Sequence, residues 1–278
     1  MGVTDKVRVD LSGPARTMLS TLYCKALDAG HEHPVLGDRF AKDAVGRIDF
    51  DWDGLKIADR WTPLVTVRSA QYDIWAAEFL AGHPRATVVH LGCGLDSRVF
   101  RLEPGSGVEW YDVDYPDVIE LRKQVYPDRP GCNLLATSAT DPSWLDEIPA
   151  DRPVLLLAEG ISMYLTERDG IALLQQVVDR FGTGELQIDF YNWLAIRSQK
   201  THKLQRQSGS TLHWAVNRPA DILGRVSGIR LLAAATFFDA TTFSQTSAGF
   251  RFAGRLVRAV PPVRRMLQYH RYAFGPVS

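Results

Sequence analysis

The segment best suited to ligand chemistry spans residues 88–102 and reads VVHLGCGLDSRVFRL. A predicted strand ends at His90 or Leu91, and Gly92 and Gly94 stand where a helix is expected to begin. Glycines leave room for backbone N–H groups and the helix N-terminus to approach a ligand closely. The pattern indicates a nucleotide-type loop, although an ordinary strand-to-helix turn explains a lone G-x-G about equally well.

An acid follows at the end of the next predicted strand, in EWYDVDYP. Asp114 stands about 20 residues beyond Gly94, the separation at which such an acid accepts hydrogen bonds from ribose hydroxyls. Asp112 lies two residues earlier on the same strand face and is the competing candidate. We prefer Asp114, because ligands bind at the carboxyl ends of parallel strands.

Two ligands suit this loop: a dinucleotide such as NAD, or the adenosyl sulfonium S-adenosylmethionine. Ser97 replaces the third glycine of G-x-G-x-x-G, which is a departure from the dinucleotide fingerprint. The sequence also has no Tyr-x-x-x-Lys pair and no phosphate-binding G-x-x-x-x-G-K-[ST]. A nucleotide-dependent oxidoreductase therefore remains an alternative, and an ATPase or kinase of that kind is disfavoured.

A sulfonium that carries an amino-acid tail needs acceptors for its ammonium and a cation for its carboxylate. Asp141 and Glu159 follow the third and fourth predicted strands, so they are candidate acceptors. Arg68, in the helix before the sheet, is a candidate for a bidentate carboxylate contact. Each acid taken alone fits a solvated loop or a helix cap equally well.

The elements that must position these residues change character at residue 86. From there short apolar runs alternate with helical stretches, which predicts an α/β fold with a mostly parallel sheet and helices on both faces. The predicted strands are ATVVHLG, GVEWYDVDY, NLLATSA, PVLLLAEG and ELQIDFYN. TERDGIALLQQVVDRFG is a predicted crossover helix, with Thr166 as its N-cap and Gly182 beyond its end.

The flanking segments predict a domain organisation. Helical spacing in residues 15–27, 40–48 and 61–82 indicates an N-terminal helical cap over 1–85, before a Rossmann-like core over 86–278. Residues 193–228 are expected to form a helical lid inserted after the fifth strand. Within it, Arg197, Lys200, Lys203 and Arg206 are spaced as on one helix face, where a solvated surface is favoured over anion capture. IRLLAAATFF is expected to be a strand, and the aromatic run at the end of FRFAGRLVRAVPPVRRMLQYHRYAFG a final edge strand.

Composition limits the possible partners. The chain has 278 residues, 45% of them hydrophobic, and its 32 basic residues balance 32 acidic ones. Zero net charge gives no support for nucleic-acid or membrane binding. The three cysteines form no CxxC pair, and no long apolar run is present, so we expect a cytoplasmic protein. The seven histidines form no metal-binding motif, and we expect no metal.

Several motifs together suggest a family. LGCGLDSRVFRL, YDVDYPDVIELR and AEGISMYLTE, preceded by RSAQYD and HPVLGDRFAKDAVGRIDFD, resemble the leucine carboxyl methyltransferase family. The similarity is greatest to its bacterial branch, which includes O-methyltransferases of aromatic polyketide (tetracenomycin) biosynthesis. It covers about residues 20–195 in order, with a weaker match at YHRYAFG.

This resemblance implies a class I S-adenosylmethionine-dependent methyltransferase fold and a role for each candidate. Arg68 would hold the methionine carboxylate, Gly92 would line the methionine portion, and Asp114 would bind the ribose. Gly94, in the same loop, is a further cofactor-binding candidate. Asp141 would face the adenine, and Glu159 the methionine end. Pro142 stands where family members usually have Leu, which questions the adenine contact.

The expected reaction is methyl transfer to a carboxylate or phenolic oxygen of a small molecule. An ionised carboxylate needs positioning only, whereas a phenol would benefit from a base. Tyr164 is the candidate for the acceptor pocket, with packing of its ring an equal alternative. Because no base is evident, a catalytically silent cofactor-binding protein is a further alternative. A homodimer is possible.

Overall fold

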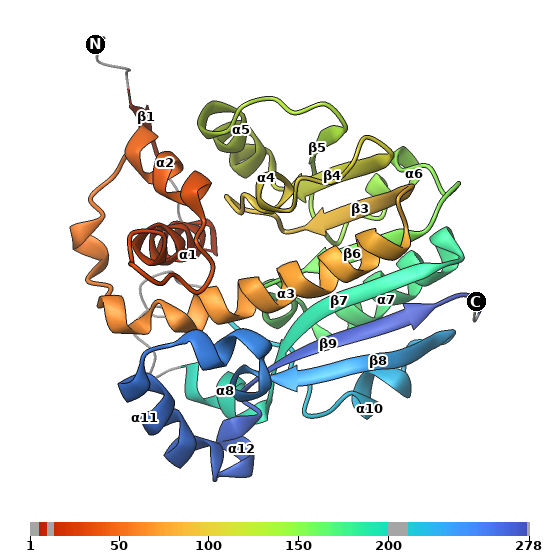
Figure 1. Cartoon of the computed structure of the whole chain (residues 1–278). Helices are drawn as coiled ribbons and strands as arrows, with labels where there is room; N and C mark the ends of the chain where they lie inside the picture. Colours follow the sequence, from red (N-terminus) through yellow and green to blue (C-terminus); the bar gives the residue numbers. More distant parts are fainter. Residues whose placement is uncertain (1–5, 10–13, 200–210, 277–278) are drawn as a thin grey trace.

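The structure is a computed structural model that describes residues 6–9, 14–199 and 211–276. Within these residues, seven strands form one sheet in the order β5-β4-β3-β6-β7-β9-β8 (Figure 1). Strands β3 to β7 pair in parallel, as the alternating pattern predicts. Their bounds, with those of the last two strands, are Ala86–Leu91 (β3), Val108–Asp114 (β4), Cys132–Ala136 (β5), Val154–Ala158 (β6), Gly184–Tyr191 (β7), Ile229–Thr236 (β8) and Leu267–Phe274 (β9).

The expectation of a final edge strand is wrong. β9 lies between β7 and β8 and pairs antiparallel with both, so that β8 forms the edge. The reason is burial on both faces of β9, where Tyr269 and Tyr272 are fully buried in the two different cores. β8 instead exposes Leu231 and Leu232, which an edge position tolerates.

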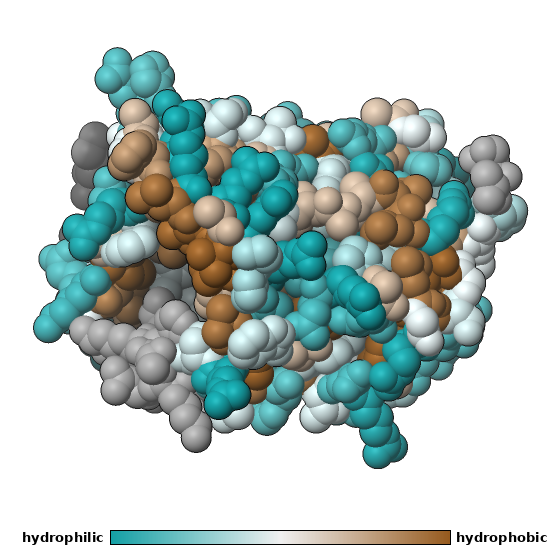
Figure 2. Space-filling view, turned by 90° about the horizontal axis from the view of Figure 1, so that it is seen from below, coloured by the Kyte–Doolittle hydropathy of each residue, from teal (hydrophilic) through white to brown (hydrophobic). Residues whose placement is uncertain are grey.

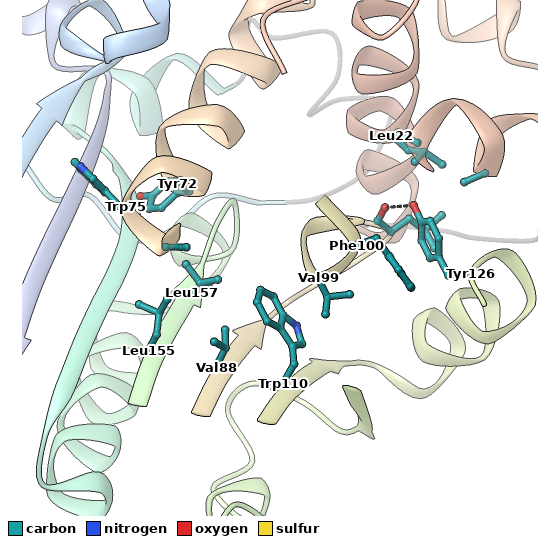
Figure 3. Close-up of a cluster of buried hydrophobic side chains, with 14 of the residues drawn as sticks. Leu22, Tyr72, Trp75, Val88, Val99, Phe100, Trp110, Tyr126, Leu155 and Leu157 are labelled. Atoms are coloured by element: carbon teal, nitrogen blue, oxygen red, sulfur yellow. Dashed lines mark hydrogen bonds between the residues drawn. The ribbon is translucent and has the colours of Figure 1, made fainter. Parts of the chain in front are cut away.

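Helices cover both faces of the sheet, which confirms the predicted α/β class. Leu155 and Leu157 of β6 point into one core, with α1 (Pro14–Asp28), α3 (Pro63–Gly82) and α5 (Pro116–Val125) (Figure 3). Leu156, between them, points into the other core, where α7 (Glu167–Phe181) packs. This alternation follows from the two-residue period of a strand.

Helix ends lie close to where the sequence places them. Pro63 opens α3, and Thr166 caps α7 by accepting the N–H of Asp169. α2 (Arg39–Arg47) is capped by Asp38. Two features were not predicted: a short parallel pair of β1 (Val7–Arg8) and β2 (Ile48–Asp49), and the 3-10 turns η1 (Asp53–Leu55) and η2 (Asp59–Trp61).

Of the segments after β7, the helices α8 (Trp193–Ser198), α11 (Ala248–Arg258) and α12 (Pro261–Arg264) lie toward the carboxyl ends of the parallel strands, whereas α10 (Ala220–Leu223) lies beside β8 (Figure 1). The described part of 193–228 holds α8 and α10. Lys200, Lys203 and Arg206 lie outside the described residues. After β8 come η5 (Phe237–Asp239), η6 (Thr241–Gln245), α11 and α12. Among the described helices, none has the length and hydrophobicity to span a membrane.

Candidate functional site

The sheet has a topological switch point beside β3, which pairs with β4 on one side and β6 on the other. Ligands of open α/β sheets bind at such a point, outside the carboxyl ends of the strands. A cavity of about 220 Å³ lies there, and we call it the loop cavity. Its wall includes the predicted candidates Arg68, Gly92, Gly94, Asp114 and Glu159.

The glycine loop follows β3 directly. Gly92 has a φ of 64°, and a Cβ at this position would lie 2.5 Å from Cγ2 of Ile161, so only glycine fits without a shift. The expected helix begins later than predicted: α4 spans only Arg98–Leu102. The loop therefore presents its own backbone to the cavity rather than the N-terminus of a long helix.

Ser97, which replaces the third glycine of the dinucleotide pattern, has a structural role. Its side chain is fully buried, and its hydroxyl donates to the Asp38 carboxylate, with distances of 2.6 and 2.7 Å to the two oxygens. Asp38 also caps α2 by accepting the N–H of Ala41. Ser97 thus ties the glycine loop to the N-terminal helices, a contact that glycine could not make.

Asp114 and Asp112, the two competing acids of β4, have different environments. Asp114 lines the loop cavity, and its Oδ2 accepts the N–H of Gly94 at 2.7 Å. Burial raises the pKa of Asp114, although the N–H groups of Gly94 and Tyr115 oppose the shift. Asp112 is fully buried and accepts two hydrogen bonds from Arg122, at 2.6 and 2.9 Å. Asp112 is therefore a structural ion-pair partner, and Asp114 is the acid available to a ligand.

Glu159 and Arg68 form one ion pair at the charged end of the loop cavity. Arg68 donates from Nε to Glu159 at 2.9 Å and from Nη1 to Asp189 at 2.8 Å. Among the described residues, its Nη2 has no hydrogen-bond partner; a Cβ on Gly160 would lie 3.3 Å from that nitrogen. Burial opposes ionisation of Glu159, but the guanidinium groups of Arg98 and Arg68 outweigh it and lower its pKa to about 2. Glu159 is therefore a carboxylate at neutral pH.

Three further charged residues were missed by the sequence reasoning. Lys25 and Asp96 form a salt bridge of 3.0 Å on the wall of the loop cavity, and their side chains are only 6% and 9% exposed. Asp189 is fully buried on β7 and accepts the N–H of Gly160 at 2.8 Å besides its bond to Arg68. The sequence does contain an indication of the two acids. Asp96 lies inside the glycine motif, and Asp189 lies inside an apolar strand, where a buried acid needs a partner.

Asp141 is not brought to the cavity. Its side chain accepts the N–H of Ser143 at 3.0 Å on the surface, and that bond lowers its pKa. Thr137 and Ala139, from the same loop after β5, line the cavity instead. Pro142, which stands where family members usually have Leu, directly follows Asp141.

A second cavity, of about 640 Å³, adjoins the first and is called the apolar cavity. Both walls include Arg68 and Gly160, together with Thr17, Thr21 and Tyr164. Tyr164 belongs to η3 (Ser162–Tyr164), and burial raises the pKa of its hydroxyl. The hydroxyl is therefore protonated at neutral pH and suited to donate a hydrogen bond at the junction.

The mouth of the apolar cavity carries exposed apolar side chains. Trp61, Leu64 and Val257 line it and are 50%, 45% and 40% exposed. Figure 2 shows hydrophobic residues gathered on the left of the lower face, where Figure 1 places α11 and α12. A hydrophobic ligand suits such an opening.

Comparisons with known proteins agree with this arrangement. The model of the leucine carboxyl methyltransferase family matches residues 21–131. The chain is 38% identical over 266 residues to the tetracenomycin polyketide synthesis O-methyltransferase TcmP of Streptomyces glaucescens, which covers 96% of this chain and 98% of that protein. It is 34% identical to the S-adenosyl-L-methionine-dependent methyltransferase dpfgK of Gibberella zeae, over 81% of this chain and 83% of that one.

A solved structure shows the same fold. The DUF574 family protein from Streptomyces avermitilis superposes with a TM-score of 0.56 and 12% identity, over 92% of this chain and 97% of the other. The switch point, the glycine loop and the named relatives together define a class I S-adenosylmethionine-dependent methyltransferase. Within that class, the chain belongs to the leucine carboxyl methyltransferase family.

Proposed function

We propose that this protein methylates a carboxylate or phenolic oxygen of a small hydrophobic molecule held in the apolar cavity. The proposal rests on one observation: Arg68, Gly160 and Tyr164 line both the loop cavity and the apolar cavity. An acceptor and a donor bound in the two cavities would therefore meet at these residues. Proximity of this kind supplies much of the rate enhancement when the donor is already activated.

The loop cavity fits S-adenosylmethionine in the chemistry of its wall. Asp114 at one end is suited to accept from ribose hydroxyls. Arg68, also on this wall, has a free Nη2 for the methionine carboxylate, as far as the described residues show, and the carboxylates of Glu159 and Asp96 would accept from the ammonium. The cofactor supplies, when bound, a methyl group activated by its sulfonium. Asp141 as the adenine contact stays a prediction, and Thr137 and Ala139 are better placed on the wall.

The chain's own residues then position the acceptor and exclude water. The N-terminal cap (1–85) supplies Thr17, Trp61 and Leu64 to the apolar cavity, and the proposed lid (193–228) supplies Ala195 and Leu212. Closing the site with apolar walls strengthens the electrostatic contacts inside. Tyr164, protonated at neutral pH, would donate a hydrogen bond to the acceptor oxygen rather than remove its proton.

The names of the relatives support an oxygen acceptor of polyketide type. One relative acts, by its name, in tetracenomycin polyketide synthesis as an O-methyltransferase. Neither that relative nor dpfgK is an oxidoreductase by name, so the nicotinamide alternative gains no support. The protein would act as a cytoplasmic enzyme on a small molecule, without nucleic acid or membrane.

A labelled-methyl assay tests the proposal. The protein is incubated with methyl-labelled S-adenosylmethionine and panels of hydrophobic carboxylic acids and phenols, and the product is treated with base. Esters release the label under base, whereas ethers keep it. We expect label in at least one organic product; binding of the cofactor with no transfer to any acceptor would indicate the silent binding protein instead.

A further inference from the structure

Asp189 holds the junction of the two cavities from behind. It lies near the carboxyl end of β7, is fully buried, and is not among the described residues that line either cavity. Its side chain contacts two residues that line both. Oδ2 accepts from Nη1 of Arg68 at 2.8 Å, and Oδ1 accepts the N–H of Gly160 at 2.8 Å.

The backbone of Asp189 adds a third contact at the same place. Its carbonyl oxygen accepts the buried hydroxyl of Ser162. Ser162 begins η3, the turn that ends in Tyr164. One residue of β7 therefore fixes both the arginine and the turn that the two cavities share.

Arg68 is held at two of its three nitrogens. Glu159 accepts from Nε at 2.9 Å, and Asp189 accepts from Nη1. A single hydrogen bond would leave the guanidinium free to turn about it, whereas two bonds to two carboxylates fix its plane. Gly160 lies against this plane, because a Cβ there would lie 3.3 Å from Nη2 and 3.5 Å from Nη1. Asp189 thus determines the direction in which Nη2 points.

Stability alone does not explain a carboxylate at this position. Tyr269, opposite Asp189 in the pairing of β7 with β9, is fully buried and packs on Tyr72, with 5.8 Å between the ring centroids. Burial raises the pKa of Asp189, although Arg68 and the N–H of Gly160 oppose the shift. Replacing a buried ion pair by apolar side chains is often neutral or stabilising, so the orientation that the pair imposes is the better explanation.

We propose that Asp189 is a positioning residue for methyl transfer that acts through Arg68, which rests on the proposed function of the two cavities. It aims Nη2 of Arg68 at the carboxylate of the methionine tail and holds the turn that carries Tyr164. The tail of the donor is therefore fixed by a residue that does not touch it. A misplacement of about 1 Å at such a junction slows a reaction strongly.

Paired ligands test this role. S-adenosylhomocysteine and S-adenosyl-3-thiopropylamine, the analogue that lacks only the carboxylate, are titrated calorimetrically into wild type and Asp189→Asn. Wild type should bind S-adenosylhomocysteine at least about 10-fold more tightly than the analogue, because the analogue makes no charge-assisted bond to Arg68.

The variant should separate the two ligands further from the wild-type pattern. The NH2 group of Asn cannot accept a hydrogen bond, so Asp189→Asn loses the bond to Arg68 or to Gly160. The affinity for S-adenosylhomocysteine should fall about 10-fold, while that for the analogue stays within about 2-fold of wild type. A general defect of the cavity would weaken both ligands alike.

Glu185→Gln is the matched control. Glu185 lies four residues earlier on the same face of β7, is 8% exposed, and accepts from Arg271 at 2.7 and 3.1 Å. It is not among the described residues on either cavity wall, so this variant should bind both ligands as wild type does. If Asp189→Asn does not fold, Asp189→Glu gives the same comparison, because it keeps the buried charge and moves the carboxylate by one methylene.

Three results would overturn the positioning role. They are equal wild-type affinities for the two ligands, an unchanged affinity for S-adenosylhomocysteine in the Asp189 variant, and equal losses for both ligands. No binding of S-adenosylhomocysteine to the wild type would instead count against the proposed function.

Discussion

The two cavities are built by different means. The loop cavity is walled by charged residues that neutralise one another in buried pairs, such as Lys25 with Asp96 and Arg68 with Glu159. The apolar cavity is walled mainly by hydrophobic side chains, and the charged residues that line it, in the part of the chain that the structure describes, are cations. A site that binds one constant cofactor can be held rigidly by ion pairs, whereas a site for a hydrophobic acceptor depends on shape and a few polar contacts.

The largest effect should come from breaking the buried charges behind the loop cavity. Arg98 is fully buried and donates to Asp73 at 2.6 Å and to Glu159 at 2.5 Å. Arg98→Met should lower the free energy of unfolding by about 3–5 kcal/mol, because it leaves buried carboxylates uncompensated. Urea denaturation measures this change.

A surface pair provides the control for that variant. Arg225 and Glu167 lie 2.8 Å apart and are more than half exposed. Arg225→Met should cost less than about 1 kcal/mol. Equal losses in the two variants would contradict a special role for buried ion pairs at the loop cavity.

The pH dependence of stability is a second test of the buried ion pairs at the loop cavity. Because the pKa of Glu159 is lowered to about 2, its ionised form stabilises the folded state above the unfolded pKa of about 4.5. That contribution, on the order of 3 kcal/mol, should be lost as pH falls from about 4.5 to 2. The stability difference between wild type and Glu159→Gln should therefore shrink over this range, as followed by urea denaturation. A constant difference would show that Glu159 is not held ionised by its arginine partners.

A smaller effect is expected in the glycine loop. Gly92→Ala places a Cβ 2.5 Å from Ile161 at a φ of 64°, which should cost about 1–3 kcal/mol and weaken cofactor binding. Gly82, at the end of α3, has open space around its Cβ position, so Gly82→Ala should change stability by less than about 1 kcal/mol. Thermal unfolding and calorimetric titration of both variants measure the two effects; similar behaviour would argue against a tight fit at Gly92.

The smallest effect concerns the junction of the two cavities. Since burial raises the pKa of Tyr164, Tyr164→Phe should remove only a hydrogen-bond donor and slow methyl transfer by less than about 10-fold. A general base would cost about 100-fold or more. Tyr23→Phe is a control, because Tyr23 stacks on Trp52 and lines neither cavity. A loss of 100-fold in Tyr164→Phe would make Tyr164 a base.

The loop cavity was largely predictable because its residues follow strand ends. Gly92, Asp114 and Glu159 each stand directly after or at the end of a parallel strand, and parallel strands bring these ends to one edge. The apolar strand around Asp189 indicates an acid that needs a partner, but its pairing with Arg68, like that of Lys25 with Asp96, was not predictable, because a single sequence does not show which charged side chains meet.

The apolar cavity could not be assembled from sequence patterns. Its wall combines α1, the η1 and η2 turns, the end of β7 and the segment from η5 to β9, which meet only in the folded chain. The position of β9 inside the sheet also depends on long-range antiparallel pairing with β7. Such non-local contacts have no local periodicity to indicate them.

Calorimetric titration of S-adenosylhomocysteine into wild type and Asp114→Asn tests the central assignment most directly. We predict saturable binding to the wild type and an affinity about 10–100-fold lower in Asp114→Asn, because the ribose contact loses its charge. Asp117→Asn, on the exposed first turn of α5, should bind as the wild type does. No binding to the wild type, or equal affinity in Asp114→Asn, would contradict the placement of the cofactor in the loop cavity.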